Sequence, residues 1–329
     1  GLIIGAAAVL TAVASASAEQ SPLPEVDGIT LSEAAVTSRL DGMDQPVIIG
    51  VPDSYDEATP TPLLVGLHTW SGDYRQQAKA YGGQAAERGW LLVLPNFRGP
   101  NKASNPNVQQ AGGSLFAQHD IVDARAHMIE AYNVDESRVY LTGDSGGGHM
   151  TMLMAGKWPD LWTACAAWVP VTDLRDWWSV KNGYAKDIVA VCGGEPGDSP
   201  EVDFEYTRRS PRTFMTNLAH IPVLLGHGDS DGTIPVEQSW RTFRALRDIP
   251  HHNTLMYVFS GGHTGLQTPG LDWCVEHTGS AAPARELHIV TDESKAYYWA
   301  DLHVADNTQL ATADVVPSEK AISIATANL

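Results

Sequence analysis

The sequence predicts an α/β fold in which helices flank a mostly parallel sheet, and three observations support this class. Continuously apolar runs of strand length, such as residues 63–67, alternate with segments of helical periodicity, such as residues 118–132. A Gly-Asp-Ser-Gly-Gly turn lies between a strand pattern and a helix pattern within residues 139–154. The 329 residues are also enough for one large domain with a small appendage. We therefore expect one α/β domain over residues 29–280.

Residues 1–18 are predicted to be a secretory signal peptide that lacks its initial Met and basic segment. An apolar run over residues 2–13 is too short to span a bilayer, and Ala16-Ser17-Ala18 after it is typical of a cleavage site. Residues 19–28, which contain Pro22 and Pro24, are expected to form a linker. The protein is therefore expected to be secreted or periplasmic.

The first half of the α/β domain is predicted to begin with a hairpin. Within residues 29–51, the turn dipeptide Asp41-Gly42 separates two strand-like stretches. The run 63–67 is apolar throughout, as expected of a strand buried on both faces of a sheet. A helical pattern over residues 76–88 stops at Gly89, a residue favoured just after a helix. The rest of this half is predicted to be a buried strand over 90–97, an Asn-, Pro- and Gly-rich loop over 98–113 and a helix over 118–132.

The second half of the domain continues the alternation around one interruption. Residues 173–212 have a weak pattern and many aromatic side chains, which predicts a lid or substrate-facing insertion between two strands. The periodic elements are predicted to be a strand over 139–143, a helix to residue 158, strands over 163–171 and 223–228, a helix over 236–247 and a strand over 254–260.

Residues 284–329 differ from the preceding domain because they alternate apolar and polar residues without a helical period. This pattern predicts a β-rich C-terminal segment with four short strands, over residues 286–291, 296–304, 311–316 and 321–328. Four short strands make a marginal independent domain, so the segment is expected either to pack on the α/β domain or to be incomplete.

The formal net charge of −18 argues against nucleic acid and anionic membranes as partners and favours a substrate that is uncharged near the reacting bond. Three cysteines in an exported protein fit one disulfide and one free thiol. Cys165 lies in an apolar strand pattern and is expected to be free. Cys192 and Cys274 lie beside glycine-rich loops and are expected to form the disulfide. No His and Cys cluster predicts a metal site.

Ser145, at the centre of the Gly-Asp-Ser-Gly-Gly turn, is the predicted nucleophile. A sharp strand–turn–helix connection holds such a serine in a strained backbone conformation and lifts its hydroxyl above the sheet. Gly143 and Gly147 fit this geometry because a β-carbon at either position would clash with the neighbouring strand or helix. The alternative is a glycine-rich turn that happens to contain a serine, and the partner residues found downstream disfavour it.

A serine nucleophile needs a base, and the base needs an orienting carboxylate. His263 is the expected base because it follows the last strand of the domain through two glycines. Asp231 is the expected carboxylate, in a His-Gly-Asp-Ser-Asp-Gly-Thr-Ile-Pro stretch that follows an earlier strand. Asp229 and His227 of the same stretch are expected to cap the loop and to make a structural contact, respectively.

The negative charge that develops on the substrate oxygen during acyl transfer requires backbone N–H donors. Gly146 is expected to supply one, since it directly follows the nucleophile at the N-terminus of a helix. The second donor is assigned to Trp70 in the loop His68-Thr69-Trp70, which follows the strand over residues 63–67. Thr69 remains the alternative for this second donor.

Three aromatic residues of the insertion, Trp177, Trp178 and Tyr184, are predicted to bind substrate. For any one of them, packing is the more common role, but a Trp pair beside a hydrolytic site offers a platform for a sugar or an aromatic ring. The acidic residues of the same insertion are expected to form a solvated face rather than a ligand site; they are Glu195, Glu201, Asp203 and Glu205.

Together these motifs resemble the α/β-hydrolase superfamily and, within it, exported esterases of the prolyl oligopeptidase type. The resemblance covers about residues 40–275 and rests on the turn around Ser145, the Tyr-x-x-Arg-Ser-Pro run from Tyr206 to Pro211, the His-Gly-x-x-Asp stretch and the final Gly-Gly-His. It implies an eight-stranded sheet and a triad of Ser145, Asp231 and His263. Oligopeptidases of this type carry a large N-terminal β-propeller, for which the segment before residue 29 is too short. The resemblance therefore favours the esterase branch, similar to secreted feruloyl, acetylxylan and polyester-cleaving enzymes.

The sequence thus predicts a secreted serine hydrolase that cleaves carboxylic esters through an acyl-enzyme and needs no cofactor. Its substrate is expected to be a small-molecule or polymeric ester of the carbohydrate-linked, aromatic or polyester type. The alternative is a serine exopeptidase or small-peptide hydrolase with the same triad, in which the acidic cluster of residues 195–205 would bind a free amine. A non-catalytic binding module built on the C-terminal segment is a third hypothesis, which the intact triad disfavours.

Overall fold

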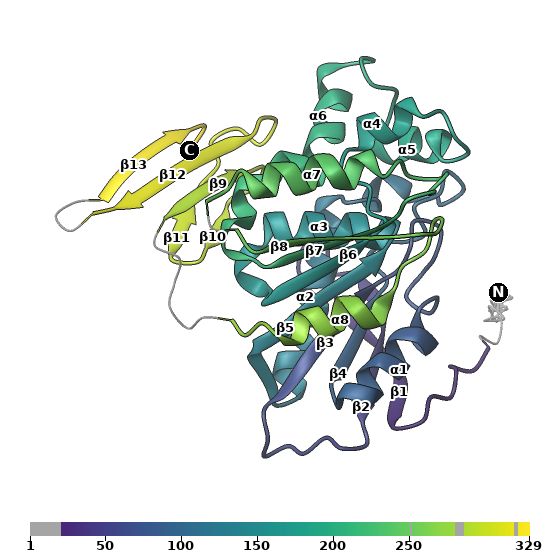
Figure 1. Ribbon diagram of the computed structural model, residues 1–329. Helices are drawn as coiled ribbons and strands as arrows, with labels where there is room; N and C mark the ends of the chain where they lie inside the picture. The colour runs from purple at the N-terminus through teal and green to yellow at the C-terminus, as the bar shows by residue number, and fades with distance from the viewer. Residues whose placement is uncertain (1–20, 251, 280–285, 319–321) are drawn as a thin grey trace, which may run out of the picture.

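The computed structural model of the protein describes residues 21–250, 252–279, 286–318 and 322–329. The predicted signal peptide, residues 1–18, lies outside this part of the chain. Figure 1 shows a central sheet with helices on both sides and a smaller group of C-terminal strands against one side.

Eight strands form the central sheet, and their order in space differs from their order in the chain. They are β1 (Ile29–Thr37), β2 (Asp44–Pro52), β3 (Thr61–Leu67), β4 (Leu91–Pro95), β5 (Val134–Asp144), β6 (Ala164–Trp168), β7 (Val223–Gly228) and β8 (Thr254–Phe259). The spatial order is β1-β2-β4-β3-β5-β6-β7-β8. The β1–β2 and β2–β4 pairs are antiparallel and all the other pairs are parallel. The predicted eight-stranded, mostly parallel sheet is confirmed.

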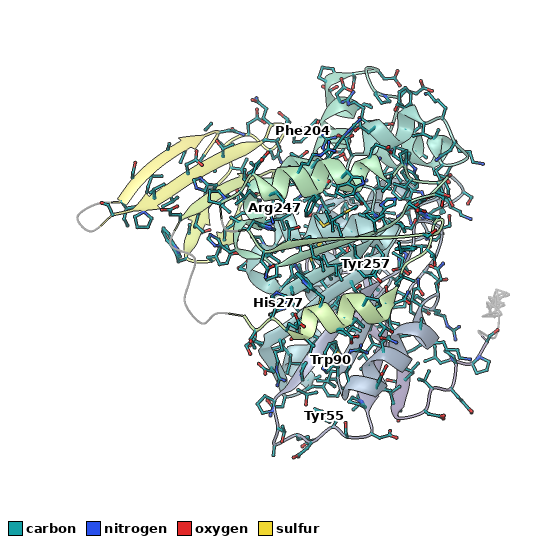
Figure 2. All side chains as sticks on the ribbon, viewed as in Figure 1. Tyr55, Trp90, Phe204, Arg247, Tyr257 and His277 are labelled. Carbon is teal, nitrogen blue, oxygen red and sulfur yellow. The ribbon has the colours of Figure 1, made fainter. Side chains whose placement is uncertain are left out.

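Helices cover both faces of this sheet, as the continuously apolar strands require. Helices α1 (Ala78–Arg88) and α8 (Gln267–Val275) cover one face, and α2 (Leu115–Ala131), α3 (Gly146–Lys157) and α7 (Glu237–Arg247) cover the other (Figure 1). Leu64 packs toward the α1 and α8 face, whereas its neighbours Leu63 and Val65 pack toward the opposite face. Trp90 adds to the first face by packing on Tyr140, with ring centroids 5.0 Å apart (Figure 2).

Short helical turns complete the connections, and they are η1 (Val108–Gln110), η2 (Pro159–Leu161) and η3 (Pro211–His220). Within the described ranges, no helix combines the length and the apolar character that crossing a bilayer requires.

The insertion over residues 173–212 contains three short α-helices, which the weak sequence pattern of this segment did not reveal. They are α4 (Leu174–Ser179), α5 (Ala185–Cys192) and α6 (Pro200–Arg208). Asp173 and Ser199 cap α4 and α6, because their side chains accept hydrogen bonds from backbone N–H groups in the first turn. Helices of six to nine residues are too short for an apolar period to stand out in the sequence.

The disulfide predicted between Cys192 and Cys274 is wrong, because both cysteines are free and buried. Cys192 ends α5 and packs in the apolar cluster beneath the insertion, whereas Cys274 lies on α8 in the cluster that packs against the sheet. Gly193, beside Cys192, follows the end of α5, whereas Gly270, near Cys274, lies within α8. Burial raises the pKa of the Cys192 thiol to about 12, which makes it a poor nucleophile at neutral pH.

The C-terminal region is β-rich, as predicted. Its described strands are β9 (Leu287–Thr291), β10 (Lys295–Tyr297), β11 (Ala300–Leu302), β12 (Ala311–Pro317) and β13 (Ile322–Ala327). The β9, β12 and β13 strands form one antiparallel sheet, and β10 and β11 form a hairpin where a single strand was expected. The region packs on the α/β domain through Asn217 of η3, whose side chain hydrogen-bonds the backbone N–H and C=O of Val290 at 2.7 and 2.8 Å.

Candidate active site

The carboxyl ends of the parallel strands lie at one edge of the sheet, and the loops that follow them bring the predicted site residues together. Ser145 follows β5, Asp231 follows β7 and His263 follows β8. His263 Nδ1 lies 2.7 Å from Asp231 Oδ2, and His263 Nε2 lies 2.8 Å from Ser145 Oγ. Because an ionised carboxylate only accepts hydrogen bonds, Nδ1 carries the proton and Nε2 is free to accept the serine proton.

Ser145 occupies a strained turn between β5 and α3. Its φ of 58° and ψ of −115° are unusual for a residue with a side chain, and the turn directs Oγ toward His263. Gly143 must lack a side chain, since a β-carbon there would lie 2.5 Å from the carbonyl carbon of Gly147. The structure thus shows the close approach that the sequence pattern predicted around the serine.

Asp231 is held by more partners than its histidine alone. The backbone N–H groups of Thr233 and Ile234 donate to Oδ1 at 2.8 and 3.0 Å, and His227 Nε2 lies 3.2 Å from Oδ2. Burial by itself would raise the pKa of Asp231, but the hydrogen bonds from His227, His263 and the backbone outweigh it and hold that pKa well below its usual range. Asp231 is therefore ionised throughout the neutral range and can orient His263.

The two other residues singled out in this stretch, Asp229 and His227, make the loop-capping and structural contacts that were expected of them. Asp229 is exposed and accepts a hydrogen bond from the backbone N–H of Gly261 at 3.1 Å, as a loop-capping carboxylate does. His227 is buried and contacts Ser239 Oγ and the Ile234 carbonyl oxygen. Its additional contact with Asp231 was not anticipated from the sequence.

Two backbone N–H groups lie where a substrate oxyanion could be held. Gly146 begins α3, and the first N–H groups of a helix have no acceptor within the helix. Trp70 lies directly beside it, because a β-carbon on Gly146 would be only 2.2 Å from the Trp70 nitrogen. The N–H of Thr69 instead donates to Gln76 Oε1 at 3.1 Å. Of the two alternatives for the second donor, the geometry favours Trp70.

A cavity of about 250 Å³ opens over the serine and is lined mainly by polar groups. Tyr184 from the insertion lines it, together with Asp144, Val169 and Ser71, and with the triad and oxyanion residues Ser145, His263 and Trp70. The other two predicted substrate residues are not among its lining residues. Trp177 is fully buried beneath Tyr184 and donates its indole N–H to the Thr233 carbonyl oxygen, and Trp178 lies beside Lys181.

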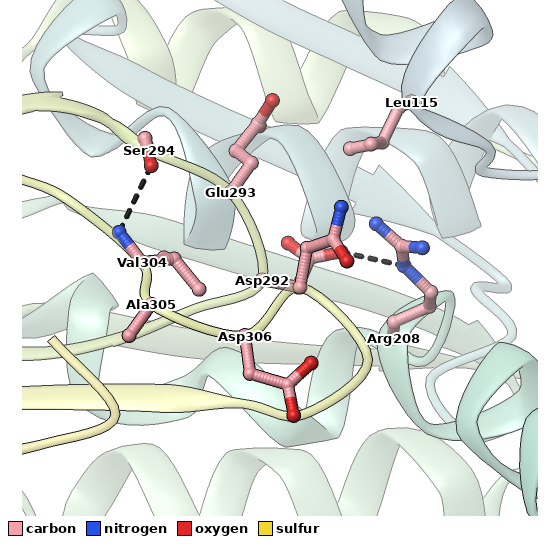
Figure 3. Close-up of a pocket in the computed structure, with 9 residues that line it drawn as sticks. Leu115, Arg208, Asp292, Glu293, Ser294, Val304, Ala305 and Asp306 are labelled. Carbon is pink, nitrogen blue, oxygen red and sulfur yellow. Dashed lines mark hydrogen bonds and ion pairs between the residues drawn. The ribbon is translucent and has the colours of Figure 1, made fainter.

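The acidic residues of the insertion do not line this cavity either. Asp203 pairs with Arg175 at 2.9 Å, and Glu205 pairs with Arg209 at 2.6 Å. A larger cavity of about 450 Å³ lies elsewhere, between α6 and the C-terminal region, where Arg208 contacts Asp292 (Figure 3). It contains no nucleophile with a base. Across the described ranges, no group of three or more His, Cys, Asp or Glu side chains could hold a metal ion.

Asp144 is a residue of the cavity wall that sequence reasoning passed over. It stands directly before Ser145, and its side chain is almost fully buried. Gln267 of α8 donates to its Oδ2 at 2.8 Å. Burial raises the pKa of Asp144 to about 6. An acidic residue inside the nucleophile motif was the signal available in the sequence, but the glutamine partner is 123 residues away.

Comparisons with known proteins agree with this geometry. The sequence profile of the prolyl oligopeptidase family matches residues 79–274, more than half of the chain. An acylamino-acid-releasing enzyme of Rattus norvegicus is 25% identical over 226 residues, which are 63% of this chain and 29% of that enzyme. An acetylxylan esterase of Coprinopsis cinerea is 32% identical over 114 residues, which are 32% of this chain and 30% of the esterase.

Among solved structures, the acylaminoacyl peptidase of Pyrococcus horikoshii in its orthorhombic crystal form is similar with a TM-score of 0.62 at 20% identity. The similarity covers 74% of this chain and 39% of the peptidase chain, and at this identity it concerns the fold alone. The matched part of this chain therefore spans well under half the length of each of these three relatives.

Proposed function

The chain belongs to the prolyl oligopeptidase family, and from this premise we propose that it hydrolyses small peptides whose amino terminus is acylated. The observation that carries the proposal is that His263 is hydrogen-bonded to both Ser145 and Asp231 within a domain of this family. The choice of an acylated substrate is supported by the acylamino-acid-releasing enzymes among its relatives.

The geometry fits acyl transfer through a covalent intermediate. Ser145 Oγ attacks the substrate carbonyl carbon while His263 Nε2 takes its proton, and Asp231 holds the imidazole in the required tautomer. The N–H groups of Gly146 and Trp70 donate to the oxyanion. His263 then gives the proton to the leaving amine as the carbonyl–nitrogen bond breaks. Water attacks the acyl-enzyme by the same route, which releases the acid and restores Ser145.

The charges around the cavity favour a blocked amino terminus over a free one. A free ammonium group needs a carboxylate that faces the substrate, yet Asp203 and Glu205 of the insertion are paired with arginines outside the cavity. Asp144 lines the cavity, but it is almost fully buried: its Oδ2 accepts hydrogen bonds from two glutamine side chains, and its Oδ1 lies against the Gly265 backbone. An uncharged acyl group therefore suits this site better than an ammonium group does.

Ester hydrolysis, the activity that the sequence alone favoured, is the second candidate. It is supported by the acetylxylan esterase, which has the highest identity of the relatives described above although the match is short. The same serine, histidine and oxyanion donors can cleave an ester, because an ester oxygen leaves more readily than an amide nitrogen that has not been protonated.

A direct test compares three substrate types on purified protein: N-acetyl-alanine p-nitroanilide, alanine p-nitroanilide and methyl ferulate. We expect kcat/KM to be highest for the acylated anilide and at least about tenfold lower for the free-amine anilide. Turnover of methyl ferulate without any anilide cleavage would instead establish the ester hydrolase. Faster cleavage of the free-amine anilide would overturn the preference for an acylated end.

Ser145→Ala is the control that ties every activity to this site. Because the serine, histidine and oxyanion donors act as a unit, we expect a loss of at least about 10⁴-fold in kcat for whichever substrate is cleaved. Circular dichroism should show an unchanged fold. Activity that persists in the folded variant would contradict the assignment of Ser145.

We also propose that the protein is exported, with residues 1–18 removed. The support is the apolar run followed by Ala16-Ser17-Ala18. N-terminal sequencing of the mature protein from its natural host is expected to begin at Glu19, and a mature chain that retains residues 1–18 would contradict export by this route.

A further inference from the structure

Asp144 lies directly before the nucleophile, and the mechanism above gives it no role. Its carboxylate is buried at the end of β5. Gln267 Nε2 donates to Oδ2 at 2.8 Å, and Gln77 Nε2 lies 3.4 Å from the same oxygen. Oδ1 is buried and has no hydrogen-bond partner among the described residues. Burying a carboxylate with one unpaired oxygen costs folding free energy. The presence of an aspartate at this position therefore needs an explanation.

The carboxylate lies against the loop that carries the base. This loop runs from His263 to Gln267, the first residue of α8. A β-carbon on Gly265 would lie 2.1 Å from Asp144 Oδ1, so the loop backbone passes directly over that oxygen. Asp144 therefore contacts the loop at two positions beyond the base, through Gly265 and Gln267.

The strand that precedes this loop pairs with β7 on one side, and its other side is only partly covered. β8 is the edge strand of the sheet, and half of its residues are exposed, among them Tyr257 (Figure 2). The 2.8 Å contact between His263 Nε2 and Ser145 Oγ needs the loop and the end of β5 to keep their register. A misplacement of about 1 Å at a catalytic contact can cost about 100-fold in rate.

We propose that Asp144 is a positioning residue whose carboxylate fastens the loop bearing His263 to the strand that leads into Ser145. This inference rests on the proposed serine hydrolysis and adds to it the element that holds base and nucleophile in register. The hydrogen bond to Gln267 forms the link, and the Gly265 backbone, which leaves room for the carboxylate, allows the loop to lie flat against it.

The test measures kcat and KM for the best substrate and the rate at which a fluorophosphonate labels Ser145. We expect Asp144→Ala and Gln267→Ala each to lower kcat and the labelling rate by about 10- to 100-fold, with KM changed by less than about threefold. Asp144→Asn keeps an acceptor for Gln267 and is expected to remain within about threefold of the wild type.

Gln77→Ala is the matched control. Gln77 approaches the same carboxylate oxygen with the same kind of side chain, but it belongs to the segment before α1 rather than to the loop of the base. We expect this variant to keep kcat and the labelling rate within about threefold of the wild type. A loss as large as that of Gln267→Ala would overturn the proposal, because any disturbance of the carboxylate would then have the same effect.

Other outcomes separate this inference from the function on which it rests. A wild-type protein that the fluorophosphonate does not label at Ser145 would overturn the proposed function itself. Normal labelling of the wild type, with equally fast labelling of Asp144→Ala and Gln267→Ala, would overturn only the positioning role. A raised KM with unchanged kcat in Asp144→Ala would make Asp144 a substrate-binding residue instead. If Asp144→Asn is as slow as Asp144→Ala, the charge of residue 144 matters rather than its hydrogen bond to Gln267, and the positioning role is overturned. If Asp144→Ala does not fold, Gln267→Ala and Asp144→Asn decide the question.

Discussion

Asp231 and Asp144 are both shielded from solvent, yet their pKa values move in opposite directions. Burial would raise the pKa of either group. In Asp231 the hydrogen bonds from two histidines and two backbone N–H groups outweigh burial and lower its pKa. In Asp144 burial prevails and raises the pKa to about 6, although the Gln267 hydrogen bond and the nearby His263 counteract it. The two carboxyls thus suit different tasks: Asp231 is permanently charged, whereas Asp144 titrates just below neutral pH.

The raised pKa of Asp144 predicts a pH-dependent effect of Asp144→Asn on stability. Below its ordinary value of 3.8 the carboxyl is protonated in both the folded and the unfolded chain. As pH rises through about 6 the folded protein must accept a buried charge, so the stability contributed by the protonated group is lost. Asparagine never ionises. We expect the free energy of unfolding of Asp144→Asn, relative to the wild type, to improve by about 2–3 kcal/mol between pH 4 and pH 8.

Urea unfolding at the two pH values measures this difference. The titratable groups that face Asp144 are His263 from the loop after β8 and Tyr81 from α1, and both are present in the two proteins. The same difference in stability at both pH values would contradict the prediction, since an effect of shape or hydrogen bonding alone does not depend on the charge of residue 144.

The residues of the site that could be predicted from the sequence are those marked by local turn chemistry. Ser145 stands in a glycine turn between strand and helix, and His263 follows two glycines at a strand end. The contact of Asp144 with Gln267 has no such mark, because it joins positions 123 residues apart. The same holds for the cysteines: Cys192 and Cys274 each lie near glycines, but only the fold reveals that they belong to separate clusters.

At the level of elements, the connection from β5 to α3 is the most constrained part of the site. Gly146 begins α3 and lies against the loop after β3, which carries Trp70. The two proposed oxyanion donors are adjacent because that glycine has no side chain. This packing explains why the turn was recognisable in the sequence, because tight backbone contacts require glycine. The short helices α4 to α6 of the insertion were not recognisable, because a six-residue helix has few residue requirements and shows no clear apolar period.

Gly146→Ala is therefore expected to separate the oxyanion donors. The new β-carbon would lie 2.2 Å from the Trp70 nitrogen and 2.4 Å from its Cα, so the loop must move away. Loss of one such donor lowers kcat by about 10²- to 10³-fold, and we expect a loss of that size with little change in KM. Steady-state kinetics on the protein, with its fold checked by circular dichroism, measure the effect.

Gly83→Ala on α1 is the control for this substitution. A β-carbon at Gly83 meets no atom within 4 Å, and alanine suits a helix better than glycine does. This variant should keep its activity and gain up to about 1 kcal/mol of stability. A Gly146→Ala protein with an unchanged kcat would contradict this prediction and, with it, the assignment of the Gly146 and Trp70 N–H groups as the oxyanion donors.

On the scale of the whole molecule, the C-terminal region is joined to the rest by a buried ionic contact. Asp292, just after β9, lies 2.6 Å from Lys157 Nζ at the end of α3 and 2.7 Å from Arg208 Nε at the end of α6 (Figure 3 shows the Arg208 contact). The side chains of Lys157 and Asp292 are fully buried. Burial would raise the pKa of Asp292, but Lys157 and Arg208 lower it. One carboxylate thus connects the nucleophile helix, the insertion and the C-terminal strands.

This contact predicts that the C-terminal region unfolds together with the α/β domain rather than by itself. Asp292→Ala would leave the Lys157 ammonium buried without its carboxylate, and breaking a buried pair in this way costs about 3–5 kcal/mol. We expect that loss in the free energy of unfolding, measured by urea denaturation with both intrinsic fluorescence and far-UV circular dichroism. In the wild type the two signals should follow one transition.

Asp314→Ala provides the comparison within the same region. Asp314 on β12 pairs with His288 at the surface, where both side chains are about half exposed, and such pairs contribute about 1 kcal/mol or less. A small effect of both substitutions would mean that water reaches the Lys157 ammonium after the carboxylate is removed. Two separate transitions in the wild type would mean that the C-terminal strands are an independent unit, held to the α3 and α6 ends too weakly to share their stability. A large loss confined to Asp292→Ala, within a single transition, would instead make the C-terminal region part of the scaffold that supports the nucleophile helix.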